Sequence, residues 1–460
     1  MTASLARNRN YQLLWGSQAL SAFGINASTI ALPLLVLAMT GSPAATGLVL
    51  GTSAAAQLLA GLPAGVLADR WNRKKIMLSC EAVQAIAAGS LVVALLWGVA
   101  SLAYLVVVVA VMGVCAALFE PAEDACLPNL VPDEQLSTAV AMNSARGHLA
   151  QLSGTAAGGF LFAVGRFVPF AVDVLTHTVA FFFLVFLRIP PRKEVLKPAG
   201  NLGREMVAGL RWIWQQRPVR TIGALAVALN LFLAAYFVII IVVAQARGVS
   251  AGEIGIMAAM LGVGGIMGAL IAPYLHQRMS PYLSITAVFW VLTALTPVAL
   301  FISNGYLMGA LFAGMAFLVP TANTTIETYQ LLLTPDELRG RMSGALGVVT
   351  GIAGSAGPAL GGLLLEMVSG NHAILLCAAG VGTITLFATT SSTLRAFPRV
   401  VSIDDGDTPS AVRHSKTSIG FRQFSVMRGL PFSSAATLSI SSWVQDDTSM
   451  SLGKTYRRKL

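Results

Sequence analysis

The chain has 460 residues, of which 55% are hydrophobic and only 11% are charged, and its mean hydropathy is +0.73. A soluble domain carries roughly 25% charged residues, so this composition excludes a soluble protein and indicates a membrane protein. The formal net charge of +10 needs no nucleic-acid partner, because membrane topology and a basic C-terminal tail account for it. Four cysteines without CxxC spacing are interpreted as packing residues.

Apolar runs of about 20 residues, each long enough to cross roughly 30 Å of hydrocarbon, recur along the chain. We therefore predict an all-α membrane protein with twelve transmembrane helices in two six-helix bundles. The helices are centred near residues 26, 56, 87, 112, 150, 178, 231, 264, 292, 319, 354 and 383. The predicted parts are an N-terminal bundle (1–187), a cytoplasmic linker with an amphipathic helix (188–218), a C-terminal bundle (219–395) and a disordered, serine-rich cytoplasmic tail (396–460).

Basic residues orient these spans. Of the 30 Lys and Arg residues, 27 fall on one side of the predicted membrane. Loops rich in Lys and Arg are retained in the cytoplasm, so both termini are predicted to be cytoplasmic.

The first span carries polar residues that can line a substrate cavity. Gln18 and Asn26 are the main candidates, with Ser21, Ser28 and Thr29 beside them. Most such residues simply pack or hydrogen-bond between helices, which is the alternative for each of them.

Residues 65–75 put one acid and four bases between the second and third apolar runs. The segment resembles the signature loop of the major facilitator superfamily, Gly-x-x-x-Asp-Arg-x-Gly-Arg-(Arg/Lys). The matching residues are Gly65, Asp69, Arg70, Arg73 and Lys74. Asn72 replaces the second glycine, and Asn tolerates the left-handed conformation better than most residues. The segment is interpreted as a gating loop; the alternative is an ordinary basic loop that keeps its side of the membrane.

Ionisable residues within the spans are the next candidates, because each costs at least ~2.5 kcal/mol on insertion scales. Asp173 and His177 stand four residues apart on one face of the sixth span, where they can hold a proton. Asp173 is the only acid that we place well within a span of the N-terminal half. Arg146, near His148 in the fifth span, is expected to lie near Asp173. The alternative for Asp173 is a hydrogen bond between helices.

The linker contains an apolar stripe opposite polar side chains, which predicts an amphipathic helix at the inner membrane surface. Its members are Met206, Val207, Leu210, Ile213 and Trp214. In the seventh span, Asn230 and Tyr236 are further candidates for the substrate cavity.

Two short motifs recur at an offset of 203 residues, which predicts two homologous halves. Gly154 to Gly159 matches Gly357 to Gly362, and Pro132-Asp-Glu matches Pro335-Asp-Glu. The same offset relates Asp124 to Glu327 in the tenth span. Each acid lies eight residues before a cytoplasmic Pro-Asp-Glu turn, so both are predicted inner-gate acids. Glu327 is also a candidate for proton coupling.

Further motifs resemble the branch of the superfamily that contains siderophore exporters and macrolide or multidrug efflux proteins. They lie at residues 7–15, 119–122, 127–128, 209–212 and 335–341. This resemblance implies a bacterial inner-membrane protein whose two bundles rock about a central site, exporting an amphipathic solute in exchange for protons. The helix 5 antiporter signature ends in Gly-Pro-x-x-Gly-Gly, but here Thr155 replaces the proline and the full ending stands at 357–362. Proton-coupled uptake therefore stays open.

No Walker loop, metal-ligand cluster or nucleophile elbow is present in the sequence, so neither an enzyme nor a cofactor is predicted. The predicted partners are a small-molecule substrate, protons and membrane lipid, and the protein is expected to be a monomer. A non-transporting sensor that keeps the transporter fold, with the tail as its interaction segment, is the alternative from another functional class.

Overall fold

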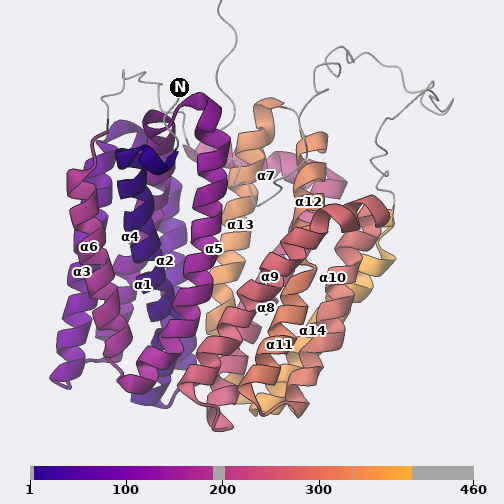
Figure 1. The fold of residues 1–460 in the computed structure, drawn as a ribbon. Helices are drawn as coiled ribbons and strands as arrows, with labels where there is room; N and C mark the ends of the chain where they lie inside the picture. The colour runs from indigo at the N-terminus through magenta and orange to yellow at the C-terminus, as the bar shows by residue number, and fades with distance from the viewer. Residues whose placement is uncertain (1–4, 190–201, 335, 396–460) are drawn as a thin grey trace, which may run out of the picture.

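The computed structural model describes residues 5–189, 202–334 and 336–395, and helices make up nearly all of this part (Figure 1). The predicted tail and most of the linker's first half lie outside the described residues. After a short turn of 3-10 helix at Leu5–Arg7, the N-terminal bundle contains α1 (Arg9–Thr40), α2 (Pro43–Arg70), α3 (Arg73–Leu96), α4 (Leu102–Leu130), α5 (Asp133–Val164) and α6 (Val168–Phe186).

The linker helix α7 (Leu202–Gln215) leads to a second bundle, which stands beside the first (Figure 1). This bundle contains α8 (Arg217–Ala246), α9 (Ala251–Arg278), α10 (Pro281–Leu295) with its 3-10 extension η2 (Thr296–Phe301), α11 (Gly305–Phe317), α12 (Val319–Leu333), α13 (Asp336–Met367) and α14 (Gly370–Thr390), followed by the short α15 (Ser392–Arg395). The predicted architecture of two helical bundles is confirmed.

Eleven segments of the described chain are long and apolar enough to cross a membrane. The remaining long helix, α5, has 32 residues, and charged and small polar side chains lower its hydropathy. It nevertheless runs the length of the N-terminal bundle, where it packs on α1 and on α9 of the other half (Figure 1). Its position is that of a twelfth span.

The tenth span is interrupted, which the apolar pattern did not predict. α11 ends at Phe317 and α12 begins at Val319, with Pro320 in its first turn. Proline has no backbone N–H, and its ring clashes with the carbonyl one turn earlier, which weakens the helix at this point. The interruption is the single residue Leu318, with φ −89° and ψ −8°, and the segment still forms one membrane span. Pro297 likewise lies in the first turn of η2, the 3-10 helix that ends the preceding span.

Helix bounds repeat at the offset found in the sequence. α5 and α13 both have 32 residues and begin 203 residues apart, at Asp133 and Asp336. α4 spans Leu102–Leu130, and α11 with α12 spans Gly305–Leu333, which is the same interval moved by 203. The two halves thus place equivalent residues on equivalent helices.

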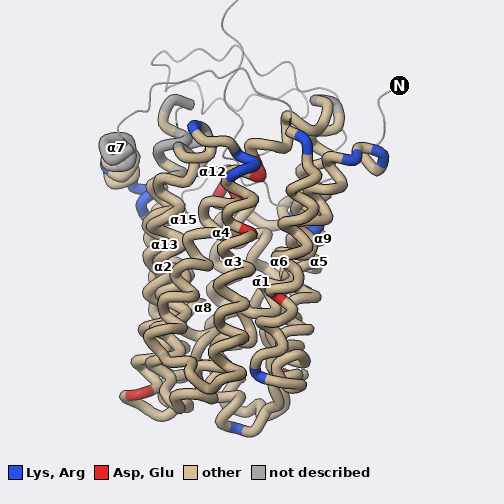
Figure 2. The backbone as a smooth tube through the Cα atoms, turned by 90° about the vertical axis from the view of Figure 1, so that its left-hand side faces the viewer, with Lys and Arg blue, Asp and Glu red and all other residues tan. Residues whose placement is uncertain are grey.

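Lys and Arg residues crowd the end of the molecule that carries α7 (Figure 2). We call this end the basic end and the opposite one the far end. At the far end the two halves touch through backbone. A Cβ added to Gly47 of α2 would collide with the carbonyl of Pro358 on α13, and one added to Gly159 of α5 would collide with Ala251 and Gly255 of α9.

A hydrogen bond between the halves lies beside this backbone contact at the far end. The hydroxyl of Ser42 donates to a carboxylate oxygen of Glu366 on α13 at 2.5 Å. Toward the basic end the same helices separate, because a Cβ added to Gly65, Gly147 or Gly265 would have nothing within 4 Å. The halves are therefore closed at the far end and apart at the basic end, and in Figure 1 they lean away from each other toward α7.

The linker helix α7 lies against the basic end of α13 and α8. Its predicted apolar stripe is split in two: Ile213 is buried with Val219 and Met342, whereas Leu210 and Trp214 are exposed. Arg220 lies over the Trp214 ring, with its guanidinium carbon 5.5 Å from the ring centre.

Candidate transport site

Three ionisable side chains meet in the interior of the N-terminal bundle, where none of them is exposed. Nδ1 of His177 on α6 lies 2.6 Å from an oxygen of Glu81 on α3, and its Nε2 lies 3.4 Å from Oδ1 of Asp173. Two residues of α1 complete the cluster, since Gln18 and Ser21 donate hydrogen bonds to Glu81 at 3.4 Å. We call Glu81, Asp173 and His177 the buried triad.

The triad confirms that Asp173 and His177 share one helix face, but the prediction that Asp173 is the only acid deep in this half is wrong. Glu81 is fully buried. A signal for it was present, because Glu81 falls in the stripe of α3 that faces the bundle core, together with Met77, Gln84, Ala88 and Leu91. An acid in such a stripe must find a partner, and here that partner is 96 residues away in sequence.

Arg146 does not pair with Asp173 as expected. Its guanidinium donates to a carboxylate oxygen of Glu123 on α4 at 2.8 Å, and both side chains are almost buried. This second acid of the N-terminal half was also missed. Charge-assisted hydrogen bonds of this length are among the stronger ones, and here the bond ties α4 to α5. His148 is exposed on α5.

Two repeat-related pairs of polar residues are exposed near the basic end. Glu120 and Asp124 stand one turn apart on α4, and Asn323 and Glu327 occupy the positions 203 residues later on α12. Neither Asp124 nor Glu327 forms an ion pair with a basic side chain within the described ranges. Both acids therefore remain available at the separated ends of the two halves.

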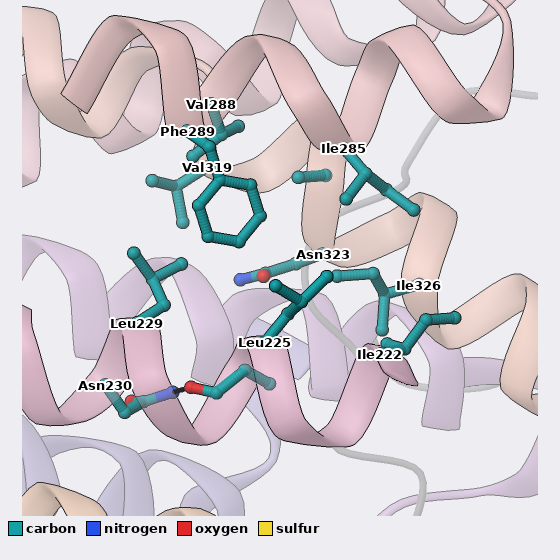
Figure 3. A pocket seen from close by; sticks show the side chains of 12 residues that line it. Ile222, Leu225, Leu229, Asn230, Ile285, Val288, Phe289, Val319, Asn323 and Ile326 are labelled. Atoms are coloured by element: carbon teal, nitrogen blue, oxygen red, sulfur yellow. Dashed lines mark hydrogen bonds between the residues drawn. The ribbon is translucent and has the colours of Figure 1, made fainter. Parts of the chain in front are cut away.

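A pocket lies inside the C-terminal half, between α8, α10 and α12 (Figure 3). It encloses about 490 Å³, including the part open to solvent. Most of its wall is apolar, and Asn230 and Asn323 supply the polar groups. Asn230 donates its amide to Ala226 of its own helix, whereas Asn323 projects between Leu225 and Leu229. Asn230 was predicted to line a cavity, while Asn323 was not singled out.

The other predicted cavity residues have different surroundings. Gln18 and Tyr236 do not line an opening, since Gln18 is buried against the triad and Tyr236 donates its hydroxyl to the carbonyl of Thr296. Asn26 donates to the carbonyl of Ala22 on its own helix. These three side chains hydrogen-bond to another side chain or to the backbone within the helix bundles, so polarity alone does not mark a cavity.

Bases of the loop between α2 and α3 bind the ends of neighbouring helices. Arg73 donates to the carbonyls of Ala68 and Ala125, and Lys74 donates to that of Val185 on α6. Asn72 does not adopt the left-handed conformation: its φ is −67°, and its side chain accepts from the backbone N–H of Lys75 as the N-cap of α3. The side chain of Asp69 lies outside the described residues, and Arg70 is exposed.

These contacts lead to a prediction for the loop. Asp69→Asn is expected to leave the protein in the membrane but to remove most of its transport, because the loop joins α2, α3, α4 and α6 at the end where the halves separate. The measurement is drug efflux normalised to the amount of membrane-inserted protein. Lys75→Gln is the matched control, since Lys75 is exposed in the same loop. Normal efflux by Asp69→Asn would rule out the gating role.

The arrangement of two bundles, with a buried charged cluster in one and an apolar pocket in the other, is that of a membrane transporter. A family model described as transmembrane secretion effector matches residues 2–404. The chain therefore belongs to this family, a branch of the major facilitator superfamily.

Several curated relatives match over most of the chain. An uncharacterized MFS-type transporter, YfiS, of Bacillus subtilis (strain 168) is 29% identical over 406 residues, which cover 84% of this chain and 95% of the relative. The multidrug efflux pump Tap of Mycolicibacterium fortuitum is 27% identical over 379 residues, covering 78% and 90%. Macrolide efflux protein A of Streptococcus pyogenes is 26% identical over 389 residues, covering 80% and 92%.

Solved structures share the fold at lower identity. The nucleoside transporter NupG superposes with a TM-score of 0.69 at 12% identity, covering 85% of this chain and all of NupG. A bacterial homologue of the iron transporter ferroportin in an inward-facing state gives 0.62 at 17% identity, covering 85% and 100%.

Proposed function

We propose that this transporter exports a hydrophobic or amphipathic small molecule, such as an antibiotic or another drug, in exchange for protons. The pocket of the C-terminal half carries the proposal. Small-molecule sites are lined mostly by apolar side chains with a few polar groups, and the apolar wall of this pocket with its two amides suits an amphipathic solute. The macrolide and multidrug efflux pumps among the relatives support the same substrate class.

Proton exchange requires titratable groups that the membrane interior would otherwise disfavour. The buried triad offers Asp173 and His177, and Glu327 offers a carboxylate exposed at the basic end. We assign Asp124 and Glu327 to an inner gate, since they are repeat-related and face the ends where the halves are apart. The loop from Gly65 to Lys74 completes that gate.

We propose that the basic end faces the cytoplasm, because Lys and Arg are retained on that side. Both termini would then be cytoplasmic, and the protein would lie in the bacterial inner membrane. We keep the predicted division of the chain into two bundles, a linker and a tail. Exposed Trp214 and the neighbouring Arg220 fit a helix α7 that touches lipid headgroups. A monomer is the expected unit.

The test is drug accumulation in cells with and without the protein, using ethidium within a panel of fluorescent amphipathic drugs, before and after collapse of the proton gradient. Ala226→Phe fills the pocket, since Ala226 is part of its wall, and should abolish the export of at least one drug. Ala224→Phe is the matched control, because Ala224 is exposed on the same helix away from the pocket. Unchanged accumulation of every drug would support a non-transporting role instead.

A further inference from the structure

We propose that Asp173 holds one exchangeable proton in the buried triad, that His177 and Glu81 are its permanent ion pair, and that losing this proton displaces α1 and opens the far end. This inference rests on the proposed proton exchange and assigns its site.

Charge counting shows why the triad exchanges a single proton. With His177 protonated and both carboxylates ionised, the triad would carry one uncompensated negative charge in a region with no exposed surface. Such a charge is strongly disfavoured in the interior of a membrane protein. One added proton makes the triad neutral, so the proton-bound and proton-free states differ by one full buried charge.

Geometry tells which carboxylate takes that proton. Glu81 accepts hydrogen bonds from Gln18 and Ser21 and lies 2.6 Å from His177, as an ionised carboxylate does. Asp173 is different, because neither of its carboxylate oxygens has a hydrogen-bond partner, and its 3.4 Å approach to Nε2 of His177 is not a hydrogen bond. A buried carboxylate without donors is far less costly when protonated, so Asp173 is the protonated member in this conformation.

Few other titratable groups surround the triad. α1 presents Gln18 and Ser21, which do not ionise, and Arg146 of α5 is paired with Glu123 of α4. Cys80 of α3 stands beside Glu81, and Cys115 of α4 lies within electrostatic reach of His177. Within the described part of the chain, His177, at 3.4 Å, is the one basic side chain at ion-pair distance from Asp173.

Asp173 also lies directly against the backbone of α1. A Cβ added to Gly24 would meet Oδ1 of Asp173 at 2.6 Å. Once ionised, this carboxylate needs donors, and the ones nearby on α1 are already bound to Glu81. The ionised carboxylate can gain hydrogen-bond donors only if α1 shifts along α6.

Close backbone contacts connect such a shift to the other half. The same turn of α1 packs on α5, where a Cβ added to Gly154 would meet the carbonyl of Phe23 at 2.6 Å, and in the next turn Ala27 packs on Gly158. The neighbouring Gly159 is part of the far-end contact with Gly255 of α9, where a Cβ would lie 2.8 Å away. Well-packed interiors deform little, so displacing α1 disturbs the far-end contact. The proton-bound triad therefore favours the conformation that is open at the basic end.

The experiment measures this opening directly in the full-length protein. Spin labels are attached at Gly147→Cys on α5 and Gly265→Cys on α9, two positions that face open space, while the four native cysteines are buried. The distance between labels is followed from about pH 3 to about pH 9, a range that spans the unperturbed His and carboxylate titrations. We expect the long-distance population of the parent protein to fall as pH rises, and Asp173→Asn to keep it at every pH.

A conservative Glu253→Gln variant, altered at the far end of the C-terminal half, should follow the parent. A second readout separates proton storage from a structural role: the Tm of purified Asp173→Asn at neutral pH should equal or exceed that of the parent, since Asn resembles the protonated acid. A lower Tm, a pH response in Asp173→Asn equal to the parent's, or no response in the parent would each overturn the inference. If the labels respond as expected while no drug is exported, the proposed substrate class fails and the proton site stands.

Discussion

Gly47→Ala is expected to shift the protein away from the conformation closed at the far end. The added methyl group would collide with the carbonyl of Pro358, which is backbone and cannot rotate away. Overpacking of this kind costs about 1–3 kcal/mol, which corresponds to a roughly 5- to 150-fold change in the ratio of the two conformations. The measurement is the labelling rate of a cysteine placed at Ser42, which should rise as the far end opens, and drug efflux should fall because one half of the cycle is disfavoured.

Gly147→Ala is the matched control, because its Cβ would have nothing within 4 Å. It should leave both the labelling rate and the folded structure unchanged. Equal labelling rates in Gly47→Ala and the parent would show that the far-end contact is looser than its geometry indicates.

His177→Ala is expected to destabilise the protein by about 3–5 kcal/mol, the usual cost of leaving one member of a buried ion pair without its partner. Glu81 would remain fully buried, with only Gln18 and Ser21 as donors. The measurement is the fraction of purified protein that stays folded after heating. His148→Ala is the control: His148 is exposed, so its loss should change stability by less than about 0.5 kcal/mol.

A double variant tests whether this loss is electrostatic. Glu81→Gln with His177→Gln replaces the ion pair with two neutral amides that can bond to each other, so most of the lost stability should return. If the double variant is as unstable as His177→Ala, the imidazole acts through its shape and packing, and the ion-pair account is wrong.

The fold was largely predictable because membrane spans obey a simple length rule. Runs of about 20 apolar residues show where the membrane-spanning helices lie. The offset of 203 residues between the repeated motifs reappears in the bounds of α5 and α13. The break before α12 was missed because hydropathy does not register Pro320, and Asn72 was misjudged because its role as an N-cap depends on where α3 begins.

The site was predictable only where its residues are close in sequence. Asp173 and His177 are four residues apart, so helical spacing alone placed them together. Glu81 contacts His177 from a different helix, and Arg146 pairs with Glu123 instead of Asp173. Both contacts depend on how the helices pack, which sequence spacing does not reveal. Asn323 could have been found by applying the 203 offset to Glu120, but a neutral amide in a polar stretch of α12 carries no signal of its own.

The low hydropathy of α5 has a consequence for how the protein is made. A helix of this composition gains little from lipid, so we expect the insertion machinery to release it inefficiently when it emerges alone. Its charged Arg146 finds Glu123 on α4, which is already synthesised, but its partner α9 follows more than eighty residues later. The final packing of α5 therefore waits for α9, and biogenesis of the first bundle is completed only after the first two helices of the second bundle have been translated.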